Sequence, residues 1–127
     1  MPVGQGLRVL LVEDSEDNRV LIEQFLAATP HHLEAAQNGA EAVSKVHAGR
    51  FDVILMDIQM PVMDGYAATR AIRVWERERG IVPQRILALT AHALDEDREK
   101  SREAGCDGHL SKPIRKRRLL AALMEDT

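Results

Sequence analysis

Residues 53–65 read Val-Ile-Leu-Met-Asp-Ile-Gln-Met-Pro-Val-Met-Asp-Gly, and this segment indicates the architecture of the whole chain. Its first four residues, Val53 to Met56, form a continuous apolar run, which is typical of a strand covered on both faces. The run stops at Asp57, and the residues from Ile58 to Gly65 include a proline, an aspartate and a glycine, which predict a loop. We therefore expect a buried central strand with Asp57 at its carboxyl end.

Similar short apolar runs recur on both sides of this segment, and stretches with helical spacing separate them. Further strands are predicted at residues 7–12, 32–36, 85–89 and 108–110, and helices after Ser15, at about 40–48, around 68–75, at 95–104 and at 114–124. Such an alternation implies a parallel sheet with helices on both faces and right-handed crossovers. The sequence thus predicts an α/β domain of the doubly wound type.

Two of the predicted helices should differ in how firmly they pack. The helix that follows Ser15 carries four large apolar side chains, Leu21 among them, which we expect to point into the core, with Ser15 as its N-terminal cap. The helix at 95–104 has many charged side chains but few large apolar ones. We expect this helix to be lightly anchored and therefore easily moved.

The composition is that of an ordinary globular domain. The chain has 127 residues, of which 45 % are hydrophobic and 29 % charged, and 17 Lys and Arg against 20 Asp and Glu leave a net charge of −3. A chain of this length can bury a core without disulfides or a structural metal. The single cysteine, Cys106, excludes an internal disulfide and favours a reduced, cytoplasmic compartment.

The sequence shows no signal for membrane insertion or export. The longest apolar run, residues 119–124, contains six residues, whereas a membrane-spanning helix needs about twenty. Residues 1–6 lack the basic start and apolar centre of a secretory signal. We interpret residues 1–6 as a flexible lead-in, 7–124 as one domain and 125–127 as a C-terminal tail.

Several polar residues follow the predicted strand ends and should meet at one edge of the sheet. They are Glu13, Asp14, Asp57, Thr90, Ser111 and Lys112. Three converging carboxylates repel one another unless a cation lies among them, and a set of oxygen ligands without histidine suits Mg²⁺ or Mn²⁺ rather than zinc.

The neighbouring side chains suit the binding of a phosphoryl group. Lys112 supplies a positive charge and Thr90 a hydroxyl donor. Asp57 is the candidate nucleophile, because a carboxylate that attacks an activated phosphorus forms an aspartyl-phosphate. Each residue alone also has an ordinary role, as a solvated loop residue, a surface lysine or a helix cap. The placement of all of them at strand ends favours a functional site.

Four segments together closely resemble the receiver domains of two-component response regulators. They are Leu10 to Asp14, Val53 to Gly65, Leu89 to Ala91, and Leu110 to Pro113. The resemblance runs from about Leu7 to Met124, and the charged third and fourth helices look most like receivers attached to hybrid histidine kinases. It implies a flavodoxin-like fold with five parallel strands in the order 2-1-3-4-5, flanked by five helices.

The resemblance also implies roles for the residues at the strand ends. Asp57 would accept a phosphoryl group from a histidine kinase or a histidine phosphotransfer protein. Glu13 and Asp14, together with Asp57 and the backbone carbonyl of Gln59, would bind Mg²⁺. Lys112 would contact the phosphoryl group.

Signalling in such a receiver would depend on Thr90, which moves toward the phosphoryl group. Many receivers carry an aromatic residue in the middle of the fifth strand whose rotamer follows this threonine, whereas this chain has His109. We hypothesise that protonation of His109 alters the signalling surface around the fourth helix, fifth strand and fifth helix. The alternative is that the imidazole merely fills the same surface slot.

Two further residues are candidates for setting the lifetime of the phosphoryl group. Gln59 and His92 stand two residues beyond Asp57 and Thr90, where the variable positions of the family border the hydrolytic water. The alternative for His92 is an ordinary loop residue.

The basic run at residues 115–118 does not predict nucleic-acid binding. Its charges spread around a helix, and an aromatic content of 3 % offers no platform for stacked bases. We favour a solvated face or a docking surface for acidic residues. As a free domain the protein is expected to be a monomer or a phosphorylation-dependent dimer.

The sequence therefore predicts a phosphorylation-controlled switch with slow self-catalysed hydrolysis and no turnover of an external substrate. One alternative is a receiver-like adaptor that binds partners without being phosphorylated, which would not need the acidic cluster. The other is a phosphatase or phosphotransferase acting on free substrates, which would need a substrate pocket that these short loops do not supply.

Overall fold

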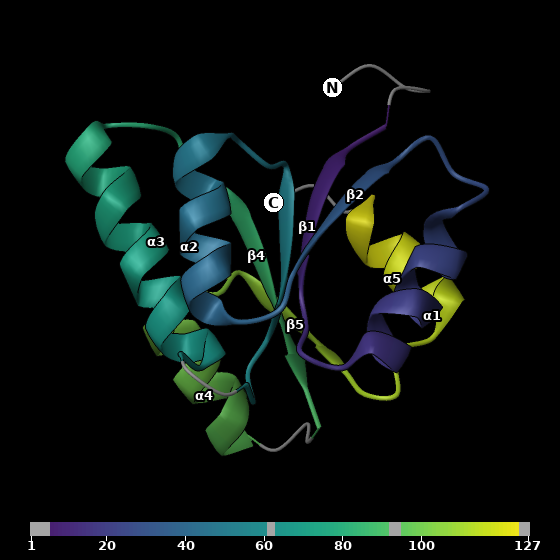
Figure 1. Cartoon of the computed structure of the whole chain (residues 1–127). Coiled ribbons are helices and arrows are strands. Elements are labelled where there is room, and N and C mark those ends of the chain that lie inside the picture. Colours follow the sequence, from purple (N-terminus) through teal and green to yellow (C-terminus); the bar gives the residue numbers. More distant parts are fainter. Residues whose placement is uncertain (1–5, 61–62, 92–94, 125–127) are drawn as a thin grey trace.

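The computed structural model describes residues 6–60, 63–91 and 95–124, and it shows an α/β sandwich (Figure 1). The strands are β1 (Arg8–Val12), β2 (His32–Ala36), β3 (Val53–Asp57), β4 (Arg85–Thr90) and β5 (Gly108–Ser111). The helices are α1 (Glu16–Leu26), α2 (Gly39–Ala48), α3 (Gly65–Arg79), α4 (Asp95–Ala104) and α5 (Lys116–Leu123). The strands form one parallel sheet in the order β2-β1-β3-β4-β5, which confirms the predicted doubly wound fold.

The central strand is apolar throughout because helices cover both of its faces. Alternate side chains of β3 enter two different cores: Ile54 and Met56 pack with residues of α2 and α3, whereas Val53 and Leu55 pack with residues of α1 and α5. Figure 1 shows α2, α3 and α4 on one side of the sheet and α1 and α5 on the other. A strand buried on both sides needs no polar face, hence the unbroken run in the sequence.

Several elements begin or end one or two residues from the predicted positions. Strands β3, β4 and β5 each extend by one residue, to Asp57, Thr90 and Ser111, because the ladder between neighbouring strands continues that far. Helix α5 begins at Lys116 and ends at Leu123, since its N-cap residue Arg115 has extended backbone angles.

The first helix contradicts one prediction. Ile22 and Leu26 of α1 are buried, but the side chain of Leu21 is 39 % exposed and lies beside the exposed Val20. The buried face of α1 is a narrow stripe of residues four apart, and Leu21 lies one position, or about 100°, away from it. The predicted cap is confirmed, because the Ser15 hydroxyl accepts a hydrogen bond from the Asn18 N–H at 3.4 Å.

The described part of α4 has the sparse anchorage that the composition of the helix predicted. In the part of α4 whose side chains are described, residues 98–104, the buried residues are Ser101 and Ala104, both small. Cys106, just beyond the helix, is a buried free cysteine, and burial raises the pKa of its thiol. Among the described residues, no helix is long and apolar enough to cross a bilayer.

A histidine holds the start of the first strand. His31 Nδ1 accepts a hydrogen bond from the Leu7 N–H at 3.0 Å, and the His32 N–H donates to the Leu7 carbonyl at 2.8 Å. Burial, and then the neighbouring His32, lowers the pKa of His31. The folded protein therefore disfavours the protonated imidazole, which cannot accept this hydrogen bond.

We expect acid to weaken the fold partly through His31. Because its folded-state pKa lies below the unfolded value, the unfolded chain binds more protons, so this contribution is present above about pH 6.5 and is lost as the pH falls below it. The urea midpoint of a His31→Ala variant should fall less than that of wild type between about pH 7.5 and about pH 5.5. Equal shifts for the two proteins would contradict this role.

Candidate functional site

The carboxyl ends of four strands bring acidic, basic and hydroxyl side chains together. Glu13 follows β1, Asp57 ends β3, Thr90 ends β4 and Lys112 follows β5. The Lys112 Nζ lies 3.2 Å from Glu13 Oε1 and 3.2 Å from Asp57 Oδ1. With Asp14, the two acids form a cluster in which one carboxylate oxygen from each residue lies within 4.8 Å of the others. The sequence-based placement of these residues at one sheet edge is therefore what the structure shows.

Backbone hydrogen bonds hold the first acid in position. The Glu13 N–H donates to the Ala36 carbonyl at 3.0 Å, and Glu13 Oε2 accepts from the Ser15 N–H at 3.2 Å. The guanidinium of Arg19 donates to the Glu13 carbonyl at 2.8 Å. The beginning of α1 thus orients the side chain that the end of β1 delivers.

A close backbone approach shapes the loop after Asp57. A Cβ at Gly65 would lie only 2.3 Å from the Asp57 carbonyl oxygen, so the first turn of α3 comes this near only because residue 65 is glycine. The Gln59 N–H donates to Asp57 Oδ1 at 3.1 Å. Oδ1 thus has both the Gln59 amide and the Lys112 ammonium as partners.

Electrostatics favour a charged lysine at this site. Burial by itself would lower the pKa of Lys112, but the carboxylates of Asp57 and Glu13 outweigh burial and raise it. The ammonium is therefore protonated at neutral pH and offsets part of the local negative charge. Lys112 carries one positive charge and Glu13, Asp14 and Asp57 carry three negative charges, so these four side chains together keep a net negative charge.

The chemistry of this cluster fits a hard divalent cation. Glu13 and Asp57 are buried and Asp14 is exposed, so the oxygens reach from the interior to the surface. Glu13 Oε1 is buried and makes no hydrogen bond within the described residues, although it pairs with Lys112. Carboxylate oxygens at this spacing suit Mg²⁺, which keeps several water ligands and needs few from the protein.

Thr90 presents a hydroxyl that the rest of the described structure does not use. Its Oγ1 is buried without a hydrogen-bond partner there, and its carbonyl accepts from the Lys112 N–H at 2.7 Å. An unpaired buried hydroxyl costs free energy. A ligand oxygen at the strand ends would relieve this cost if the hydroxyl turned toward it.

Three other predicted residues contribute no described side-chain contact to this cluster, although the backbone N–H of Gln59 bonds to Asp57. The side chain of Gln59 is exposed, and His109 is half-buried in β5. Burial, then Arg98 and then Arg118 lower the pKa of His109, so the neutral imidazole is favoured near pH 7. His92 lies outside the described residues.

The sequence did not predict the apolar hollow beside the acids. A small cavity of about 60 Å³ is lined by residues that include Glu13, Leu21, Lys112 and Ile114. The predicted inward orientation of Leu21 is not compatible with its place in the lining of this cavity. The signal available in the sequence was that Leu21 lies one position from the stripe formed by Ile22 and Leu26.

Most of the chain is similar in sequence to known proteins. Residues 9–124 match the family described as response regulator receiver domain. The sensor protein GacS of Pseudomonas syringae pv. syringae is 41 % identical over 120 residues, which cover 94 % of this chain and 13 % of GacS. Hybrid signal transduction histidine kinase G of Dictyostelium discoideum is 43 % identical over 112 residues, covering 87 % of this chain and 3 % of that protein. The chain thus spans only a small part of these relatives.

Solved structures of receiver domains are also similar to this chain. One is the receiver domain of sensor histidine kinase PA1611 from Pseudomonas aeruginosa, whose structure has a magnesium ion in the active site cleft. It is 41 % identical to this chain, with a TM-score of 0.81, and the match covers 93 % of this chain and 94 % of that chain. The receiver domain of Ssk1 from Saccharomyces cerevisiae, solved with the histidine phosphotransfer protein Ypd1, is 32 % identical with a TM-score of 0.91, covering 96 % and 89 %.

Proposed function

The chain belongs to the family of response regulator receiver domains, and on this premise we propose that it is a signalling switch whose Asp57 accepts a phosphoryl group from a phosphohistidine. The observation that carries the proposal is the joint contact of Lys112 with Asp57 and Glu13, each at 3.2 Å, beside the exposed Asp14. These groups supply a nucleophile, a fixed positive charge and oxygen ligands for a cation within one site.

The transfer begins with a carboxylate oxygen of Asp57, whose Oδ1 has the Gln59 amide and Lys112 as partners. The attacking oxygen forms a bond to the phosphorus while the bond between phosphorus and the donor imidazole nitrogen breaks and leaves its electron pair on that nitrogen. Lys112 neutralises charge on the phosphoryl oxygens, and Thr90 donates its unpaired hydroxyl to one of them.

The groups that would hold Mg²⁺, or Mn²⁺ in its place, are the side chains of Glu13, Asp14 and Asp57 and the backbone carbonyl of Gln59. A bound divalent cation supplies charge neutralisation for the carboxylates and the phosphoryl oxygens. The acidic cluster supports this assignment, as does the magnesium ion in the related PA1611 receiver.

The donor in this proposal is a histidine kinase or a histidine phosphotransfer protein. The Ssk1 receiver, which this chain resembles, was solved with such a phosphotransfer protein. Val20 and Leu21 give α1 an exposed apolar surface, and Leu21 also lines the hollow next to Glu13 and Lys112. A donor helix could dock there while its histidine reaches Asp57.

Other parts of the proposal concern the fate of the signal. Gln59 and His92 would tune how long the phosphoryl group lasts, and His109 would make the signalling surface pH-sensitive below neutrality, where its imidazole gains a proton. Transfer and hydrolysis act on the protein's own Asp57. A cytoplasmic, reducing location agrees with the single free cysteine, and a monomer or phosphorylation-dependent dimer is the expected assembly.

Intact-mass measurement tests the proposal. After incubation with acetyl phosphate and Mg²⁺, the protein should gain the mass of one phosphoryl group, and hydroxylamine should release it, as expected for an acyl phosphate. Excess EDTA should prevent the gain, because the carboxylates then repel the incoming phosphoryl group. If no labile adduct forms with Mg²⁺ present, the domain is an adaptor that works without phosphorylation.

A further inference from the structure

In sequence, helix α4 connects two opposite edges of the sheet, the edge where β4 ends and the edge where β5 begins. It follows β4, which ends at Thr90 in the acidic site, and it precedes β5, which begins at Gly108 on the opposite edge. One end of α4 is thus joined in sequence to the proposed phosphorylation site. The other end meets a polar network that the proposed reaction does not use.

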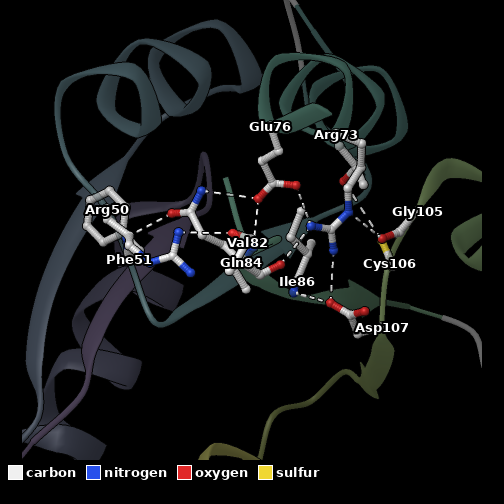
Figure 2. Close-up of polar contacts among 11 residues, drawn as sticks. Arg50, Phe51, Arg73, Glu76, Val82, Gln84, Ile86, Gly105, Cys106 and Asp107 are labelled. Carbon is white, nitrogen blue, oxygen red and sulfur yellow. Dashed lines mark hydrogen bonds and ion pairs between the residues drawn. The ribbon is translucent and has the colours of Figure 1, made fainter. Parts of the chain in front are cut away.

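Arg73 of α3 is the centre of this network (Figure 2). Its Nε donates to the Gly105 carbonyl at 2.9 Å, and its Nη2 pairs with Asp107 Oδ2 at 2.9 Å. Its Nη1 donates to Glu76 Oε1 and to the Gln84 carbonyl, each at 2.7 Å. One planar guanidinium therefore binds α3, the start of β4 and the segment between α4 and β5.

Arg73 and Glu76 are largely buried and their ion pair cannot rearrange at low cost, whereas the Asp107 side chain is 39 % exposed. The Glu76 carboxylate is almost fully buried, and its Oε2 accepts from the Gln84 N–H at 2.6 Å. Asp107 Oδ2 also accepts from the Ile86 N–H at 2.8 Å, which joins it to β4. Removing one partner from such a group leaves a buried charge uncompensated, which is strongly destabilising. The C-terminal end of α4 is thus attached to a rigid base.

The residue that ends α4 is shaped for this contact. Gly105 has a φ of +114°, a conformation that favours glycine. A Cβ at Gly105 would lie 2.8 Å from Arg73 Cγ, so the arginine side chain occupies the space that any other residue would fill. The Gly105 and Cys106 N–H groups both donate to the Ser101 carbonyl, at 3.2 and 2.9 Å, which completes the helix end.

The body of α4 has a much weaker hold. Its described side chains bury no large apolar group, and the buried Ser101 Oγ has no hydrogen-bond partner within the described residues. A groove of about 380 Å³ runs along the C-terminal half of α4, and its lining includes Arg98, Ser101 and His109 together with residues 106–108, which connect α4 to β5. The helix body can therefore shift at small cost while its C-terminal end stays fixed.

We infer that Arg73 is a positioning residue that fixes the C-terminal end of α4, so that α4 turns about Gly105 and reshapes the groove against β5 when Asp57 is phosphorylated. This inference rests on the proposed function. Movement of Thr90 toward a phosphoryl oxygen acts at one end of the helix, and the Arg73 network resists movement at the other. A rigid helix held at one end responds by tilting.

Hydrogen exchange, measured by mass spectrometry with and without acetyl phosphate and Mg²⁺, tests this inference. In wild type, phosphorylation should change exchange in peptides from residues 98–101 and leave the amides of Gly105 and Cys106 unchanged. In Arg73→Ala, those two amides should exchange about tenfold faster or more even without phosphorylation, because a charged hydrogen bond to the helix end is lost. The phosphorylation response should then extend over the whole helix.

Two further variants make the test specific. Arg77→Ala, at an exposed position one turn further along α3, is the matched control and should behave as wild type. Asp107→Asn keeps the shape of the network and removes one charge, so it should raise the exchange rate of the Gly105 and Cys106 amides to a smaller extent. This variant also provides the test if Arg73→Ala does not fold. Arg73→Ala also leaves the buried Glu76 carboxylate without its arginine partner, so the specificity of the effect is judged in Asp107→Asn. Faster exchange in β1 and β3 of Asp107→Asn as well would show a role in general stability and would overturn the pivot.

The outcomes separate the two proposals. Two further results would overturn the pivot alone. One is a wild-type protein that forms the adduct but changes its exchange equally along all of α4. The other is an unchanged exchange rate of the Gly105 and Cys106 amides in the folded Arg73 and Asp107 variants. Absence of an adduct in the wild-type sample, measured by intact mass in the same experiment, overturns the proposed function and the pivot together.

Discussion

Replacing Asp57 with asparagine is expected to abolish the labile phosphoryl adduct while the domain stays folded. The amide oxygen is a far weaker nucleophile than a carboxylate, and the substitution also removes one of the charges that attract a cation. The change preserves the volume of a side chain that is almost fully buried at the end of β3. Intact mass after incubation with acetyl phosphate and Mg²⁺ reports the loss directly.

Asp52→Asn is the matched control for this experiment. Asp52 immediately precedes the same strand, at the opposite edge of the sheet, where its carboxylate accepts a hydrogen bond from the Arg8 N–H at 2.8 Å. The control should form the adduct as fast as wild type. An adduct of equal lability on Asp57→Asn would show that another residue is the acceptor.

Replacing Lys112 with alanine is expected to slow phosphorylation and to strengthen Mg²⁺ binding. Phosphorylation should slow about 100-fold, because the only described ammonium at 3.2 Å from the acceptor carboxylate is lost. Mg²⁺ should bind more tightly, by about tenfold, because the positive charge that competes with the cation for Glu13 and Asp57 is gone. Stopped-flow phosphorylation rates and calorimetric Mg²⁺ titration measure the two effects separately.

The appropriate comparison is Lys116→Ala, which removes an equal charge from an exposed position at the start of α5. Both its rate and its Mg²⁺ affinity should remain within about twofold of wild type, since exposed charges are screened by salt. If Lys112→Ala weakened Mg²⁺ binding, the ammonium would be organising the cation site rather than competing with it, and the electrostatic account would be wrong.

The order of strands and helices was predictable because each element carries its own local pattern. The apolar run at Val53 to Met56 and the loop residues after it predicted a buried strand that ends at Asp57, and the structure has this strand as β3. The rule that parallel strands present their carboxyl ends at one edge then placed Glu13 and Lys112 near Asp57. Local periodicity was less informative about Leu21, because residues one position apart on a helix differ in burial only through the packing of the whole domain.

Local patterns in the chain thus account for the parallel sheet, the acidic edge and the sparse anchorage of α4. Packing between distant segments determined the remaining features: the ammonium of Lys112 lies 3.2 Å from two carboxylates, and Arg73 reaches Asp107, 34 residues away in sequence. Charged side chains on an amphipathic helix all resemble solvent-facing residues when only their spacing is known. The folded chain is what brings Arg73 against the end of α4 and excludes water from Glu76, so the pivot proposed for α4 depends on contacts that no periodicity encodes.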